Sequence, residues 1–186
     1  MIEMSTLKEK KIKIGDKQFK LSISEERINK EVEAIAGKIN EEMKETRPLF
    51  IAVLNGSFLF AADLLKDVTI ECEISFVKLA SYSGTSSSGI VKELVGLNEN
   101  IKDRTVVVLE DIVDTGITLE SLYAQLIKYE PKELKVAALL FKPEAYTKKI
   151  KVDYVGIEVK NEFLVGYGLD YDGLGRNLRD IYVEVS

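Results

Sequence analysis

The chain has 186 residues, of which 46% are apolar and 31% charged, and its net charge is −5. This composition is typical of one globular domain that buries a full core, and it argues against a general affinity for nucleic acid or membranes. One cysteine and no histidine exclude an intrachain disulfide and every catalytic triad that needs histidine. Acid–base chemistry is therefore left to Asp, Glu, Lys or Tyr.

No apolar run approaches the ~20 residues of a membrane span. The start of the chain is rich in Lys and Glu and lacks the apolar core of a signal peptide. We therefore expect a cytoplasmic protein.

The elements follow from apolar periodicity. An amphipathic helix is expected from about Ser24, a favourable N-cap, to Glu45, because apolar residues recur there every three or four positions. The other elements, in chain order, are a strand over 49–54, a helix over 57–66, strands over 70–76 and 105–109, a helix over 116–129, a strand over 135–141, and short strands near 154–159, 163–167 and 181–185.

Strands that alternate with helices at this spacing predict an α/β fold, a twisted parallel sheet flanked by helices. We expect one domain over 1–186. Ligands of such sheets bind beyond the carboxyl ends of the strands, near a switch in strand order. Polar residues follow the expected strand ends at Asn55-Gly56, Glu110-Asp111, Lys142 and Asp170, so the site is expected there.

The segment from Asp114 to Thr118 predicts a phosphate cradle. Gly116 lets a ligand approach the main chain, and the backbone of Ile117 together with the hydroxyls of Thr115 and Thr118 can donate to a phosphate at a helix N-terminus. No Gly-x-x-x-x-Gly-Lys-Ser/Thr loop occurs, and a short cradle suits a terminal monophosphate.

Glu110 and Asp111 come just before this cradle. Two adjacent acids repel each other unless hydroxyls or cations lie beside them, so a ribose diol, with or without Mg²⁺, is the expected partner. The alternative is that Asp114 is a helix cap and the two acids lie in a solvated turn.

The stretch Leu109-Glu110-Asp111-Ile112-Val113-Asp114-Thr115-Gly116-Ile117-Thr118 resembles the phosphoribosyl-pyrophosphate signature of type I phosphoribosyltransferases, and is most similar to their hypoxanthine-guanine branch. The resemblance extends over about 18–184. It implies purine salvage, in which the phosphoribosyl group of phosphoribosyl pyrophosphate moves to N9 of hypoxanthine or guanine, giving IMP or GMP and pyrophosphate. Asp114 would be the general base at purine N7. The fold would carry a small hood built from about 1–25 and 160–186.

Further motifs resemble other parts of that family's site. Leu54-Asn55-Gly56 resembles the pyrophosphate loop, with a cis peptide before Asn55, where family members often carry Lys or Arg. Arg176 resembles the arginine that pairs with pyrophosphate, and Arg179 is the alternative cation. Ser81 to Gly89 resembles a mobile lid led by the Ser81-Tyr82 pair, and the alternative is a plain flexible linker.

The resemblance also implies the base and metal sites. Lys142 would donate to the purine 6-oxo group, Phe163 would stack on the ring, and the main chain of Leu164 would contact its edge. Mg²⁺ is the implied cofactor, with Asp170, Glu110 and Asp111 as its ligands.

Two rival functions and one assembly question stay open. A regulatory relative could keep the phosphoribosyl pyrophosphate site and bind RNA, or the enzyme could prefer xanthine or adenine. The resemblance implies a homodimer or homotetramer. Residues 1–17 carry no interpretable motif.

Overall fold

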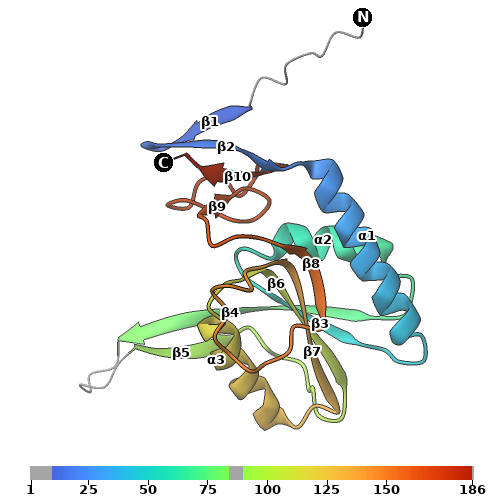
Figure 1. Ribbon diagram of the computed structural model, residues 1–186. Helices are drawn as coiled ribbons and strands as arrows, with labels where there is room; N and C mark the ends of the chain where they lie inside the picture. Colours follow the sequence, from blue (N-terminus) through green and yellow to red (C-terminus); the bar gives the residue numbers. More distant parts are fainter. Residues whose placement is uncertain (1–9, 84–89, 186) are drawn as a thin grey trace, which may run out of the picture.

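A computed structural model describes residues 10–83 and 90–185, and the side chains of 80–95 lie outside that description. Within these residues the chain forms a six-stranded and a four-stranded sheet (Figure 1). The larger sheet has the order β5-β4-β3-β6-β7-β8. Its strands are β3 (Leu49–Val53), β4 (Glu73–Ser83), β5 (Ile90–Val95), β6 (Thr105–Val113), β7 (Glu133–Phe141) and β8 (Tyr154–Glu158). All neighbours pair in parallel except β4 and β5, so the expected parallel sheet is confirmed.

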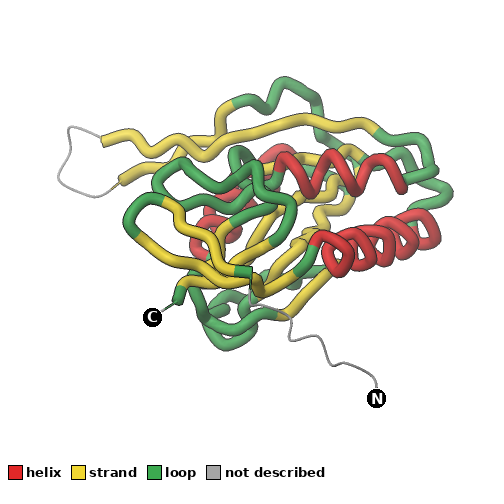
Figure 2. Tube along the Cα trace, turned by 90° about the horizontal axis from the view of Figure 1, so that it is seen from above, coloured by secondary structure: helices red, strands yellow, loops and turns green. Residues whose placement is uncertain are grey.

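Helices cover both faces of this sheet. Helix α1 (Glu25–Glu42) and helix α2 (Phe58–Asp67) lie on one face, and α3 (Ile117–Leu126), continued by the 3-10 turn η1 (Ile127–Tyr129), lies on the other (Figures 1 and 2). Successive strand residues alternate between the two cores, as a buried strand requires. In β6, for example, Val107 and Leu109 contact the α1/α2 core, whereas Val106 and Val108 contact the α3 core.

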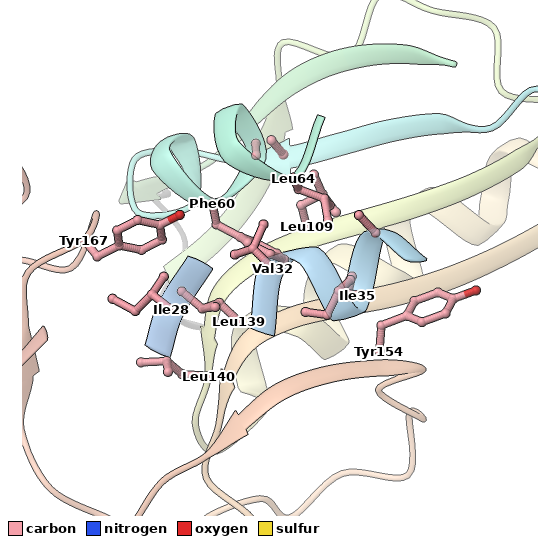
Figure 3. Close-up of a cluster of buried hydrophobic side chains, with 14 of the residues drawn as sticks. Ile28, Val32, Ile35, Phe60, Leu64, Leu109, Leu139, Leu140, Tyr154 and Tyr167 are labelled. Carbon is pink, nitrogen blue, oxygen red and sulfur yellow. The ribbon is translucent and has the colours of Figure 1, made fainter. Parts of the chain in front are cut away.

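Helix α1 begins where the sequence predicts. The Ser24 hydroxyl accepts a hydrogen bond from the Arg27 backbone N–H at 3.3 Å. The apolar stripe of the helix packs on α2 and the strands, where Ile28 and Val32 meet Phe60 and Leu64 (Figure 3). Burial of this stripe is the main force that attaches α1 to the sheet.

The four-stranded sheet joins the two ends of the chain. It has the order β1-β2-β10-β9 and consists of β1 (Lys11–Ile14), β2 (Lys17–Ile23), β9 (Leu164–Val165) and β10 (Ile181–Glu184). Figure 1 shows it above the end of the large sheet where α1 begins. Phe19, Val165 and Tyr182 are buried between its strands and the loops beside them. The segments expected to form a hood are thus paired with each other by backbone hydrogen bonds.

Several expected boundaries were wrong. The strand expected over 70–76 starts at Glu73 and runs on to Ser83. Strand β6 continues through Glu110 and Asp111, which rules out the solvated turn for those acids. The strand expected over 163–167 ends at Val165, because Gly166 adopts φ +105°.

Strands β1, β2 and β5 were not anticipated at all. Strand β5 pairs antiparallel with β4 and extends with it away from the body of the sheet (Figure 2). No helix in the described residues is long and apolar enough to cross a membrane.

Tyr167 provides a test of how the C-terminal segment is attached. Its side chain is buried, and its hydroxyl donates to Asp63 Oδ2 of α2 at 2.6 Å (its ring is labelled in Figure 3). We expect Tyr167→Phe to lower the free energy of unfolding by about 1–2 kcal/mol, because the variant loses a hydrogen bond to a charged acceptor. Urea denaturation at neutral pH measures this. Tyr129→Phe, at a 53% exposed ring, is the control and should change nothing; an equal loss in both variants would contradict the assignment.

Candidate active site

One cavity lies where the strand order switches. Strands β3 and β6 are neighbours, but the chain continues from β3 to β4 on one side and from β6 to β7 on the other, so the connections after them leave in opposite directions. A cavity of about 310 Å³ opens there, as the rule for such sheets predicts. It is lined by Val53, Leu54, Gly56 and every residue from Glu110 to Leu119. The expected cradle and the expected pyrophosphate loop therefore face the same space.

The loop after β3 approaches the acids of β6 as bare backbone. The Leu54–Asn55 peptide is cis, as the resemblance implies. A β-carbon on Gly56 would overlap the carboxylate of Asp111, and one on Gly168 would overlap the carbonyl oxygen of Gly56. Glycine at these positions is what lets the C-terminal segment reach the loop.

The cradle, Asp114 to Thr118, consists of the loop before α3 and the first two residues of the helix. Gly116 caps the helix in the left-handed conformation, at φ +82°, and a β-carbon there would overlap the Tyr146 ring. The Thr115 carbonyl oxygen accepts hydrogen bonds from the backbone N–H and the hydroxyl of Thr147, both at 3.3 Å. These contacts hold the N-terminal N–H groups of the helix toward the cavity, where an anion is favoured.

Glu110 is buried and Asp111 is half-buried near the carboxyl end of β6. Burial, with the adjacent charge of Asp111, raises the pKa of Glu110 well above its ordinary value. Burial also raises the pKa of Asp111 to about 6, with a further contribution from Asp170, while two backbone hydrogen bonds and Arg176 act in the opposite direction. Desolvated carboxyls of this kind accept hydrogen bonds from hydroxyl groups of a ligand.

A second cavity of about 190 Å³ adjoins the first. It is lined by Asp111, Ile112, Asp114, Lys142, Phe163, Leu164, Leu169 and Asp170. Asp111, Ile112 and Asp114 line both cavities, so the cradle and the expected base pocket are contiguous.

Ile112 and Leu169 were not anticipated. The strand pattern of β6 and the apolar neighbours of Asp170 were the only signals that could have indicated them.

Asp114 and Lys142 form an ion pair at the junction. Lys142 Nζ donates to Asp114 Oδ2 at 2.7 Å, and the lysine is almost fully buried whereas the aspartate side chain is 43% exposed. The two residues end neighbouring strands, β6 and β7. They present one acceptor and one donor side by side to a ligand in the second cavity.

Asp170 and Arg176 form a second ion pair. Asp170 Oδ1 lies 2.6 Å from Arg176 Nη2, and Asp170 Oδ2 accepts the Gly173 backbone N–H at 2.6 Å. Arg176 Nη1 also donates to the Gly168 carbonyl oxygen at 2.6 Å. The alternative cation, Arg179, instead pairs with Glu25 at 2.9 Å on the outside of α1. The geometry thus favours Arg176 as the cation of the site.

The remaining expected residues fall outside the two cavities or outside the description. Asn55 is exposed and lines neither cavity. Ser81 and Tyr82 are backbone-paired with Lys92 and Val91 of β5, and the stretch 84–89 of the expected lid lies outside the described residues.

Comparison with known proteins gives a consistent result. The phosphoribosyl transferase domain family matches residues 22–172. The chain is 42% identical over 161 residues to the hypoxanthine-guanine phosphoribosyltransferase of Bacillus subtilis, covering 86% of this chain and 89% of that one.

Solved structures agree. A hypoxanthine-guanine phosphoribosyltransferase from Bacillus anthracis matches with a TM-score of 0.79 at 36% identity, covering 89% of this chain and 96% of that chain. A hypoxanthine phosphoribosyl transferase from Trypanosoma cruzi matches with a TM-score of 0.81 at 34% identity, covering 94% and 95%.

The desolvated Asp111 carboxyl predicts a specific pH dependence of stability. Its folded pKa, about 6, lies above the ordinary 3.8, so its charge destabilises the fold increasingly as pH rises from about 4 to 6. In metal-free protein, Asp111→Asn should therefore be more stable than the wild type at pH 7.5, by about 1–3 kcal/mol. The difference should vanish near pH 4. Urea denaturation at pH 4, 6 and 7.5 measures it, and a difference that is constant with pH would contradict this origin.

Proposed function

The chain belongs to the phosphoribosyl transferase family, and from that premise we propose that it transfers the 5-phosphoribosyl group of phosphoribosyl pyrophosphate to N9 of hypoxanthine and of guanine. The products are IMP or GMP, and pyrophosphate. The observation that carries the proposal is the contact between two cavities that share Asp111 and Asp114. One suits a sugar phosphate and the other a flat base, and a glycosyl bond would form where they meet.

The donor is assigned to the larger cavity. The 5-phosphate binds the backbone from Asp114 to Thr118 together with the two threonine hydroxyls, because these N–H groups point out of a helix start. The ribose hydroxyls bind Glu110 and Asp111. Pyrophosphate binds the backbone from Leu54 to Gly56 and the guanidinium of Arg176, which lies near Asp170 at the side of the same loop.

The acceptor base is assigned to the smaller cavity. A 6-oxopurine carries O6 and N7 on one edge, so a base protonated at N7 offers an acceptor beside a donor. Lys142 and Asp114, 2.7 Å apart, match that pair. Adenine carries an amino group in place of O6 and would face the ammonium with a donor. Phe163, 44% exposed at the cavity, stacks on the ring, and the main chain of Leu164 contacts the base edge.

Proton transfer is assigned to Asp114. As N9 attacks C1 of the ribose, the base must lose the proton at N7, and Asp114 accepts it. Charge that develops on the departing pyrophosphate is stabilised by Arg176 and by the N–H groups of the loop. In the reverse direction, Asp114 returns the proton.

Mg²⁺ is the proposed cofactor, and the donor set fits it. Asp111 and Asp170 line the same cavity, which does not include Glu110. No group of three or more His, Cys, Asp or Glu side chains within the described residues could hold a metal alone. Two carboxylates completed by substrate oxygens and water are a common Mg²⁺ environment. Asp111 and Asp170 would hold the ion, which would supply charge neutralisation to the pyrophosphate.

The remaining proposals concern closure and assembly. Ser81 and Tyr82 would lead a lid that excludes water during transfer. The chain would act as a homodimer or homotetramer, and light scattering after size exclusion tests this. An RNA-binding role is disfavoured by the net charge of −5.

A purine series tests the proposed function directly. Purified protein with phosphoribosyl pyrophosphate and Mg²⁺ should release pyrophosphate with hypoxanthine and guanine far faster than with adenine, because only the 6-oxo group accepts from Lys142. A spectrophotometric assay with hypoxanthine, guanine, xanthine and adenine measures this. Preference for adenine, or no turnover with any base, would overturn the proposal.

Asp114→Asn tests the assignment of the base. Turnover should fall by about 10²–10⁴-fold, because the amide cannot accept the proton. Affinity for phosphoribosyl pyrophosphate, measured by calorimetry with Mg²⁺, should change far less. Asp103→Asn, at an exposed residue just before β6, is the matched control. Wild-type turnover in Asp114→Asn would exclude Asp114 as the base.

A further inference from the structure

The side chain of Lys17, at the start of β2, lies against Phe163, the ring that is proposed to stack on the purine. Lys17 Nζ is 5.3 Å from the ring centroid of Phe163 and 4.9 Å from that of Tyr171. The two rings meet edge to face, with centroids 5.9 Å apart and planes at 85°. An ammonium at such distances is attracted by both π systems, and so favours this arrangement of the rings.

Glu184 of β10 holds both partners of this contact. Its carboxylate pairs with Lys17 Nζ at 2.8 Å. Its backbone N–H donates to the Phe163 carbonyl oxygen at 3.1 Å. One residue therefore fixes the ammonium and the main chain of the phenylalanine, which closes a triangle of contacts around the ring.

The hairpin of β1 and β2 also packs against the rings of Phe163 and Tyr171. Phe19 is fully buried, and its ring centroid lies 6.3 Å from those of Phe163 and Tyr171. The Tyr171 hydroxyl donates to Asp16 Oδ1 at 2.7 Å. None of Asp16, Lys17 and Phe19 lines either cavity. Their effect on a bound base must therefore pass through Phe163.

We propose that Lys17 is a positioning residue for the purine base, acting through the Phe163 ring. Phe163 is 44% exposed and precedes the short strand β9, and Lys17 Nζ is the charged group that lies over its ring beside Phe19 and Tyr171. With the ammonium in place, the ring keeps the orientation in which it lines the base cavity. Without it, the ring turns more freely and stacking weakens. The inference rests on the proposed function, since it assumes that a base stacks on Phe163.

Three variants separate charge from bulk. Lys17→Met keeps most of the alkyl stem and removes the charge, whereas Lys17→Arg keeps the charge. Lys20→Met, at an exposed lysine of the same strand, is the matched control. We expect Lys17→Met to raise the KM for hypoxanthine about two- to fivefold, the effect of one partly exposed cation–π contact. The KM for phosphoribosyl pyrophosphate and kcat should not change, and Lys17→Arg and Lys20→Met should match the wild type.

A double-mutant cycle tests the route through the ring. Phe163→Leu removes the π system, so adding Lys17→Met to it should leave the KM for hypoxanthine unchanged. The same fold-increase in both backgrounds would overturn the proposal, because Lys17 would then act without the ring. Glu184→Gln leaves Lys17 in place but weakens its anchorage, and should raise the same KM by a smaller factor.

Thermal unfolding followed by circular dichroism distinguishes positioning from folding. A lower melting temperature in Lys17→Met, with parallel rises in both KM values, would overturn the proposal in favour of a purely structural role. If the wild type is active and Lys17→Met has the same KM values and kcat, this inference alone is overturned. A wild type that releases no pyrophosphate with any purine would overturn the proposed function and this inference together.

Discussion

The main chain of Gly168 lies against the carbonyl oxygen of Gly56, and Gly56 lies against the carboxylate of Asp111. A β-carbon at either glycine would overlap these atoms, so the segments after β3 and β9 can reach β6 only as bare backbone. The rest of the site depends on this stacking of three segments. It places Asp170 and Phe163 in the lining of the smaller cavity, with Arg176 paired to Asp170, and it makes the two cavities contiguous.

The same approach keeps water away from the acids of β6, and their electrostatics follow from that. Burial raises the pKa of both carboxyls, and the opposing charges of Arg176 and Asp170 act on Asp111. Ionisation of such carboxyls is unfavourable when no ligand is bound. A ligand that brings hydroxyl groups or a cation therefore stabilises them most. The unfavourable burial of these acids and the proposed binding of ribose and Mg²⁺ thus have one physical origin.

Local sequence predicted the parts of the site that are contiguous in the chain. The position of the cradle, Asp114 to Thr118, at a helix start could be predicted because its glycine turn and hydroxyls are local features. The buried strands could be predicted from unbroken apolar runs. Element ends were less predictable. Strand β4 starts later than expected. It runs beyond its expected end because residues 78–83 pair with β5, and this pairing depends on the register with a strand that comes later in the chain. The hairpin of β1 and β2 did carry a local signal, since Ile12, Ile14, Phe19, Leu21 and Ile23 alternate with polar residues around Gly15-Asp16.

By itself, the sequence determined the α/β fold and the glycine turn at the start of α3 that we propose as a phosphate cradle. The absence of histidine also left any acid–base role to Asp, Glu, Lys or Tyr. Tertiary structure alone decided which groups face each other: that Asp114 pairs with Lys142, that Arg176 rather than Arg179 lies beside Asp170, and that Lys17 lies against Phe163. The physical reason is that periodicity and turn chemistry act over a few residues, whereas these contacts depend on strand order and register across the whole chain.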